Sequence, residues 1–348
     1  MILALQEEIR LQSSWLSDLP IETIYLGGGT PSLLEADEIN RIFDTIFSCF
    51  ARLDLKECTL EANPDDLGNR YLRELKTTPV NRLSIGVQSF HDSDLRYMNR
   101  AHNAQQADYA IKAAQDLGFE RLTIDLIYGT PGLTDILWKQ NLRTVKELDI
   151  PHFSAYALTV EEGTQLHHSI TKKQAQPVEP EQAAQQFEIL MEMAEANGYV
   201  HYEISNLAKE GEYAVHNTNY WKGVPYLGIG PSAHSFNGRK RRWNIANNAL
   251  YITGLLREKK LHFEEEVLTE VQQLNEYLMT SLRTIWGTDL RKIANEWGAD
   301  YSSLVLKFSE ESQEKKHLVL QDGRLYLTAA GKLFADRIAA ELFIDAES

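Results

Sequence analysis

Gly27-Gly28-Gly29-Thr30-Pro31-Ser32 directly follows the strand-like run Ile21–Leu26. Glycines at the end of a strand let backbone amides approach a ligand closely, because no Cβ stands in the way. The sequence of this turn matches neither G-x-G-x-x-G nor G-x-x-x-x-G-K-[ST], which disfavours a dinucleotide site and a P-loop. The turn therefore predicts another kind of ligand site at the end of the first strand.

The same pattern of apolar run, polar turn and amphipathic helix continues to about residue 160. Helical stretches occupy Ala36–Phe50, Gln105–Leu117 and Ile136–Leu148. Strands that alternate with helices predict an α/β fold with a parallel sheet, an incomplete (β/α) barrel whose chemistry lies at the carboxyl ends of the strands. The predicted strands are Ile21–Leu26, Glu57–Ala62, Arg82–Val87, Leu122–Ile127 and Phe153–Leu158, with a sixth run, Tyr199–Ile204, after a helix at Pro180–Asn197.

After about residue 237 the sequence becomes mostly helical and ends in a hairpin signal. Leu318–Leu327 consists of two alternating runs around Asp322-Gly323. Helices followed by a hairpin could form a winged helix for DNA, but residues 262–348 hold sixteen acidic against nine basic side chains. We therefore predict a barrel domain over residues 1–237 and a smaller structural or partner-docking domain over residues 238–348.

The composition narrows the class of protein. A net charge of −15 argues against nucleic acid as the main partner, and two cysteines in 348 residues indicate a reducing compartment. The chain has no run of eighteen apolar residues, and its N-terminus lacks the basic start of a signal peptide. These features predict a soluble cytoplasmic protein without stable membrane insertion.

Polar residues lie at three strand ends where apolar ones would be easier to bury. They are Glu61, Gln88 and Asp125. A carboxylate between apolar residues must be hydrogen-bonded or face a wet cavity, because unpaired burial is costly. Glu61 and Asp125 could simply pair with a core arginine such as Arg100. Their position at successive strand ends favours a ligand site.

A second group of polar and aromatic residues lies in the loops after Tyr199–Ile204. It comprises Tyr202–Leu207, His216–Trp221 and Tyr226–Phe236, which suit a flat aromatic ligand. His216, flanked by Tyr220 and Trp221, could serve as an axial haem ligand, although a lone loop histidine is more often structural. The two cysteines, Cys49 and Cys58, have no cluster spacing and read as small buried hydrophobes.

Taken in order, these motifs resemble the oxygen-independent coproporphyrinogen oxidase-like branch of the radical S-adenosylmethionine (SAM) superfamily, and within it the HemW-type haem chaperones. The resemblance covers nearly the whole chain. It rests on G-G-G-T-P-S, E-A-N-P, G-V-Q-S-F, the N-R of Met98-Asn99-Arg100, D-L-I-Y-G, Y-E-I-S-N and H-N-T-N-Y-W.

The resemblance implies roles for individual residues. Gly28, Gly29 and Thr30 would contact the amino-acid end of SAM. His216, in the element H-N-x-x-Y-W that marks the chaperone branch, would bind haem, which family members are taken to pass to haem-requiring proteins. The residues implied to line the SAM pocket, around ribose, carboxylate and a second ligand, are Glu61, Gln88, Arg100 and Asp125.

One family feature is missing from this sequence. The C-x-x-x-C-x-x-C loop that holds a [4Fe–4S] cluster should precede the helix predicted at residues 1–12, and without its thiolates SAM could not be reductively cleaved. The uncapped start at Met1 favours a start codon placed too far downstream, and a cluster-free descendant is the alternative. A missing neighbour for Ile21–Leu26 would leave an apolar edge open, which predicts poor solubility or a homodimer.

The sequence therefore predicts a haem chaperone with a SAM-binding pocket, and whether it is an enzyme stays open. Two alternatives remain. One is a radical SAM oxidase that decarboxylates coproporphyrinogen III in porphyrin biosynthesis, and the other is a cluster-free remnant with a regulatory or scaffolding role.

Overall fold

The computed structural model describes residues 1–16 and 19–345, and the chain divides into two compact units. The first unit consists of Met1–Ile24, Asp37–Lys56 and Val215–Ser348. The second consists of Tyr25–Ala36 and Glu57–Ala214. The division into residues 1–237 and 238–348 that the sequence favours stays a prediction.

The largest sheet has seven strands in the order β1-β2-β3-β4-β5-β7-β6. Strands β2 to β5 pair in parallel, which confirms the predicted α/β class, whereas β7 pairs antiparallel with both β5 and β6. The predicted strand at Tyr199–Ile204 forms only at two residues, and β7 was missed. The strands are β1 Ile21–Leu26, β2 Leu53–Ala62, β3 Arg82–Gln88, β4 Arg121–Tyr128, β5 His152–Ala157, β6 Val200–His201 and β7 Asn206–Ala208.

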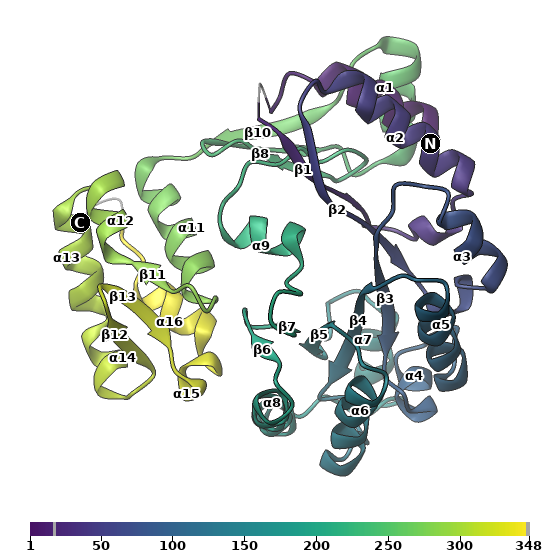
Figure 1. Ribbon diagram of the computed structural model, residues 1–348. Helices are drawn as coiled ribbons and strands as arrows, with labels where there is room; N and C mark the ends of the chain where they lie inside the picture. The colour runs from purple at the N-terminus through teal and green to yellow at the C-terminus, as the bar shows by residue number, and fades with distance from the viewer. Residues whose placement is uncertain (17–18, 346–348) are drawn as a thin grey trace. The chain divides into compact units, whose positions relative to one another are not determined.

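Helices follow the parallel strands of the second unit. Within this unit α5 packs on β3 and α8 packs on β4, as the lower part of Figure 1 shows. The predicted helices at Gln105–Leu117, Ile136–Leu148 and Pro180–Asn197 are confirmed to within a residue at each end. The helices are α3 Asn69–Leu75, α4 Asp92–Tyr97, α5 Ala104–Asp116, α6 Asp135–Glu147, α7 Gln165–Thr171 and α8 Pro180–Ala196.

The two faces of this sheet differ in polarity. Leu60, Leu83 and Ile124 are fully buried on one face. On the other face the strand register aligns polar residues, because alternate residues point the same way. One row runs across four strands, Glu61, Ser84, Thr123 and His152, and the next contains Asp125, Ser154 and Asn206. A polar sheet face is where a ligand can be held.

The first unit begins with helix α1, whose N-cap residue Met1 makes no side-chain cap. Ala4 of α1 packs with Tyr251 and Leu255 in a small core. This unit also holds an antiparallel sheet in the order β10-β9-β8. The sequence predicted mostly helix after residue 237, so β9 and β10 were missed. Its elements are α1 Ile2–Gln12, α2 Ala36–Cys49, α9 Val215–Trp221, β8 His234–Phe236, β9 Lys240–Asn244, α10 Asn248–Thr253 and β10 Phe263–Val267.

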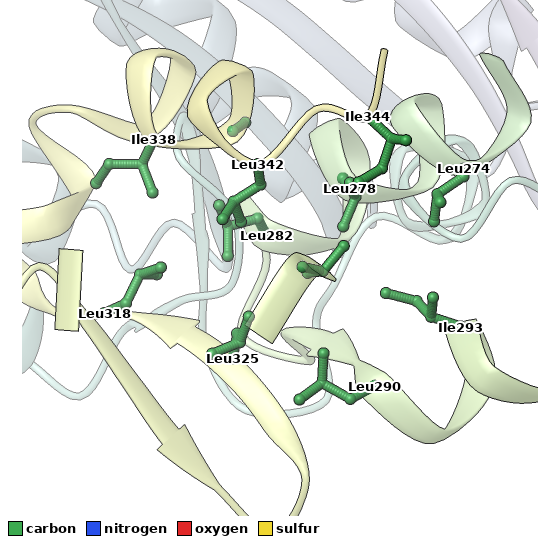
Figure 2. Packing of buried hydrophobic residues seen from close by; sticks show 12 residues of the cluster. Leu274, Leu278, Leu282, Leu290, Ile293, Leu318, Leu325, Ile338, Leu342 and Ile344 are labelled. Carbon is green, nitrogen blue, oxygen red and sulfur yellow. The ribbon is translucent and has the colours of Figure 1, made fainter. Parts of the chain in front are cut away.

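The remainder of the first unit is helical and carries a second small sheet, in the order β11-β13-β12. The predicted hairpin is confirmed, with Asp322 and Gly323 at φ 52° and 79° in its turn. Leucines and isoleucines from these helices and strands fill one closed apolar core, shown in Figure 2. The elements are α11 Glu270–Leu282, β11 Thr288–Asp289, α12 Leu290–Glu296, α13 Ala299–Phe308, α14 Glu310–Glu314, β12 Leu318–Gln321, β13 Arg324–Leu327, α15 Ala329–Lys332 and α16 Ala335–Glu341.

Within the described ranges, 1–16 and 19–345, every helix is too short or too polar to cross a membrane.

Candidate functional site

The glycine turn after β1 is held by a carboxylate from the neighbouring strand. Gly28 has φ 77°, and its N–H donates to Glu61 Oε2 at 3.0 Å, while the Tyr25 hydroxyl donates to Glu61 Oε1 at 2.8 Å. A Cβ on Gly27 would lie 2.5 Å from the Tyr25 ring, whereas Cβ atoms on Gly28 and Gly29 would meet nothing within 4 Å. Thr30 is exposed at the end of this turn. The turn therefore presents open, glycine-lined backbone beside Glu61.

Gln88 ends strand β3 in an unusual backbone conformation. Its φ of 66° lies in the left-handed region, which costs a non-glycine residue free energy. Strained residues of this kind cluster at active sites and ligand clamps. Gly86, two residues earlier, leaves the space that this side chain needs. A Cβ there would lie 2.9 Å from Gln88 Nε2 and 3.3 Å from Arg100 Nη2. The glycine thus lets the amide and the guanidinium group converge.

Arg100 binds oxygen atoms at the ends of two strands. Its Nη2 donates to Asn63 Oδ1 at 2.8 Å and to the Gly86 carbonyl at 3.4 Å. From the sequence, Glu61 could have paired simply with Arg100. In the structure Glu61 instead bonds the glycine turn, and Arg100 bonds Asn63.

Asp125 lies on the polar face of β4, between Glu61 and the β5 strand. Burial raises the pKa of Asp125 to about 6, and the Glu61 carboxylate adds to the rise. The Ser154 side chain and the charge of Arg100 act in the opposite direction. Ser154 in turn donates to Asn206 Oδ1 at 2.8 Å. Asp125 can therefore change its protonation state near neutral pH.

The second unit thus contains the predicted pocket residues Glu61, Gln88, Arg100 and Asp125. It also contains the turn residues Gly28, Gly29 and Thr30. His216 belongs to the first unit, in helix α9. Its Nδ1 lies 2.8 Å from Thr23 Oγ1, and the Tyr220 ring meets the imidazole edge-on at 4.9 Å between centroids. The side chain is only half-buried.

The two cysteines do not fit an iron–sulfur cluster. Cys58 is buried in β2, as expected, and burial raises its thiol pKa to about 11, which disfavours the thiolate. Cys49 ends α2 and is half-exposed, so the expectation that it is buried was wrong. Among the residues that the structure describes, no three His, Cys, Asp or Glu side chains are arranged to hold a metal ion.

Sequence reasoning missed several residues that complete these sites. They are Thr23, Tyr25, Asn63, Gly86 and Ser154, whereas Asn206 lay within the predicted group Tyr202–Leu207. The period of two was the signal for two of them, because Asn63 lies two positions after Glu61 and Gly86 two positions before Gln88.

Two family models match the chain. Residues 3–145 match the radical SAM superfamily, and residues 268–334 match the HemN C-terminal domain. The fold is similar to that of coproporphyrinogen III oxidase (HemN) from Escherichia coli, with a TM-score of 0.82 and 22% identity, covering 98% of this chain and 82% of that one. At this identity the likeness shows the fold alone.

Curated relatives extend over nearly the whole chain. A protein named heme chaperone HemW from Bacillus subtilis is 34% identical over 96% of this chain and 89% of its own length. One of the same name from Lactococcus lactis is 31% identical, covering 93% and 85%. A mitochondrial radical S-adenosyl methionine domain-containing protein 1 from Dictyostelium discoideum is 33% identical, covering 95% and 82%. Together with the radical SAM and HemN-type matches, these similarities show that the chain belongs to the HemW-type family of the radical SAM superfamily.

Proposed function

We propose that this protein binds haem through His216 and delivers it to haem-requiring proteins. The observation that carries the proposal is the setting of His216, a half-buried imidazole held by Thr23 and the Tyr220 ring. A histidine nitrogen is a common axial ligand of haem iron, and exposed aromatic rings suit the flat macrocycle. Tyr220 is 44% exposed beside the imidazole. Relatives named heme chaperones over almost the whole length of the chain give this proposal further support.

Haem titration followed by the Soret band tests the iron ligand. His216→Ala should weaken haem binding by about tenfold or more, which corresponds to about 1.4 kcal/mol or more. His317→Ala is the matched control, because His317 also lies against an aromatic ring, that of Phe334, in the same unit. Equal titrations for wild type and His216→Ala would reject His216 as the ligand.

We propose in addition that the second unit binds SAM. Gly28, Gly29 and Thr30 would contact its amino-acid end, because open glycine backbone allows close approach. Glu61, Gln88, Arg100 and Asp125 would surround the rest of the ligand. SAM, when bound, supplies an adenosyl group on a positively charged sulfonium. The negative charges of Glu61 and Asp125 suit such a cation.

Equilibrium binding of SAM to the full chain tests this pocket. Gly28→Ala forces a Cβ into the left-handed region and should destabilise the fold by about 1–2 kcal/mol and weaken SAM binding. Gly118→Ala is the control, because Gly118 has the same φ of 77° and a Cβ there would meet only Lys76 Nζ, at 4.0 Å, among the described residues. Gly118 lies between α5 and β4, outside the proposed pocket. SAM affinity that falls equally in both variants would contradict the assignment.

The relatives that match almost the whole chain at 34% and 31% identity are named heme chaperones, which favours haem delivery over the oxidase alternative. The cytoplasmic location and the homodimer stay predictions, although β1 does lie at one end of the strand order of the large sheet. Sedimentation of the purified chain over a range of concentrations tests the dimer.

A further inference from the structure

Thr23 and His216 are 193 positions apart, yet their side chains are in hydrogen-bond contact. Thr23 lies in the middle of strand β1 and His216 in the first turn of α9, both in the first unit. The distance from Thr23 Oγ1 to His216 Nδ1 is 2.8 Å. This is the length of a good hydrogen bond between a hydroxyl and a ring nitrogen.

The identity of the bonded nitrogen matters for iron. A neutral imidazole carries one proton, so a histidine that binds a metal through Nε2 must hold its proton on Nδ1. A hydroxyl oxygen beside Nδ1 can accept that proton in a hydrogen bond. Such a partner fixes the tautomer and the ring orientation and makes the ligating nitrogen more basic.

The plane of the imidazole is also held from a second side. Tyr220 lies one helical turn after His216, and the two rings meet at 85° with their centroids 4.9 Å apart. Tyr220 packs in turn on Tyr226 at 4.6 Å, and the Tyr226 carbonyl accepts a hydrogen bond from Trp15 Nε1. Thr23 therefore acts on a ring whose rotation is already restricted.

We propose that Thr23 is a positioning residue for haem binding, whose hydroxyl accepts the Nδ1 proton of His216 and so presents Nε2 to the iron. The inference rests on the proposed function of His216 and adds to it a residue from β1. If Thr23 served packing alone, replacing its hydroxyl by a methyl group of similar size would leave haem binding unchanged.

Replacing the hydroxyl tests this role. Thr23→Val keeps the shape of the side chain and removes the acceptor, whereas Thr23→Ser keeps the acceptor. Haem affinity should fall by ~10-fold or more in Thr23→Val, the lower end of the effect usual for such a partner of a ligating histidine, and recover in Thr23→Ser. Thr280→Val is the control, because the Thr280 hydroxyl donates to the Glu276 and Tyr277 carbonyls of its own helix.

A spectroscopic readout separates positioning from packing. The iron–histidine stretching band of the ferrous haem complex reports the hydrogen bond at Nδ1, since a more basic imidazole binds iron more strongly. We expect this band to move to lower frequency in Thr23→Val and to stay in place in Thr23→Ser and Thr280→Val. Should Thr23→Val fail to fold, Thr23→Ala is measured in the same way.

The outcomes distinguish this inference from the proposed function. If His216→Ala leaves haem binding unchanged, the ligand assignment fails and the role of Thr23 fails with it. If His216→Ala abolishes binding but Thr23→Val matches wild type in both affinity and stretching band, only the role of Thr23 is overturned.

Discussion

The polar face of the large sheet has two ends that differ in how their charges are satisfied. At the amino ends of the strands, Arg82 and Glu57 form an ion pair at 2.9 Å, and both are at most 3% exposed. Arg82 also donates to Thr123 Oγ1 and to the Glu212 carbonyl. His152 adjoins this group, fully buried, with its Nε2 2.8 Å from the Tyr202 hydroxyl.

At the carboxyl ends of the same strands the charged groups are less enclosed. Glu61, Arg100 and Asp125 are each half-buried, and Glu61 is bonded to the backbone of an exposed glycine turn. Buried charges that satisfy one another are closed to a ligand, whereas charges beside an exposed glycine turn can meet one. The contrast places structure at one end of the face and the proposed SAM site at the other, as parallel sheets generally do.

The largest expected effect concerns the amino ends of the strands, the closed end of the polar face, where Arg82 and Glu57 lie. Arg82→Met leaves Glu57 buried without its partner and should lower the free energy of unfolding by about 3–5 kcal/mol. Arg121→Met, at the register partner of Arg82 in β4, is exposed and should cost about 1 kcal/mol or less. Denaturant unfolding measures both. SAM affinity of folded Arg82→Met should equal that of wild type, and a clear loss would break the division between the two ends.

At the carboxyl ends of the strands, the open end of the polar face, a substitution should change SAM affinity. Glu61→Gln replaces a charged acceptor by a neutral one at the Gly28 N–H and removes a negative charge from the proposed pocket. We expect SAM affinity to fall by about 1.5–3 kcal/mol, the worth of a hydrogen bond to a charged group. Isothermal titration measures it, with Glu188→Gln on the exposed side of α8 as the control. Unchanged affinity would mean that Glu61 only supports the turn.

A smaller loss of stability is expected from Tyr202→Phe. It removes the hydroxyl that bonds His152 Nε2 and leaves a buried ring nitrogen without a partner, at a cost of about 1–3 kcal/mol. Burial and the charge of Arg82 already hold the pKa of His152 well below its usual value, so the imidazole cannot escape by taking up a proton near neutral pH. Tyr109→Phe, on an exposed helix face, is the control for thermal unfolding. SAM binding should not change in either variant.

The smallest expected effect is the pH dependence that Asp125 gives to stability and to SAM affinity. Asp125 has a pKa of about 6 in the fold against 3.8 ordinarily, so the folded state binds its proton more tightly than the unfolded one. Stability therefore falls as pH rises from about 4 to 6. SAM affinity should rise by about tenfold from pH 5 to 7 as the Asp125 carboxylate forms, about 1.4 kcal/mol.

Asp125→Asn should flatten both pH profiles, because its amide does not titrate. The groups around Asp125 that also carry charge are Glu61 and Arg100, and comparison with the variant removes their contribution. A wild-type affinity profile that matches that of Asp125→Asn would show that Asp125 does not face the ligand.

Much of this organisation was predictable from the sequence. The alternation of apolar runs and amphipathic helices predicted the parallel sheet, and Asp322-Gly323 predicted the hairpin, because local periodicity and turn chemistry are encoded within a few residues. Prediction was poorest where strands are short or lie outside the alternating pattern, as in β6, β7, β9 and β10. Two or three residues of strand carry too little periodicity to be recognised, and the β5 partner of β7 is remote in sequence.

For the proposed sites, the sequence alone singled out the candidate residues: the glycine turn, Glu61, Gln88, Arg100 and Asp125 at strand ends, and His216 beside its aromatic neighbours. Only the tertiary structure decided what each of them contacts. Register across parallel strands brought Asp125 to Ser154, and the packing of loops brought Arg100 to Asn63. Chain folding brought Thr23 to His216. Contacts between residues far apart in sequence depend on how whole elements pack, and no local pattern records that packing.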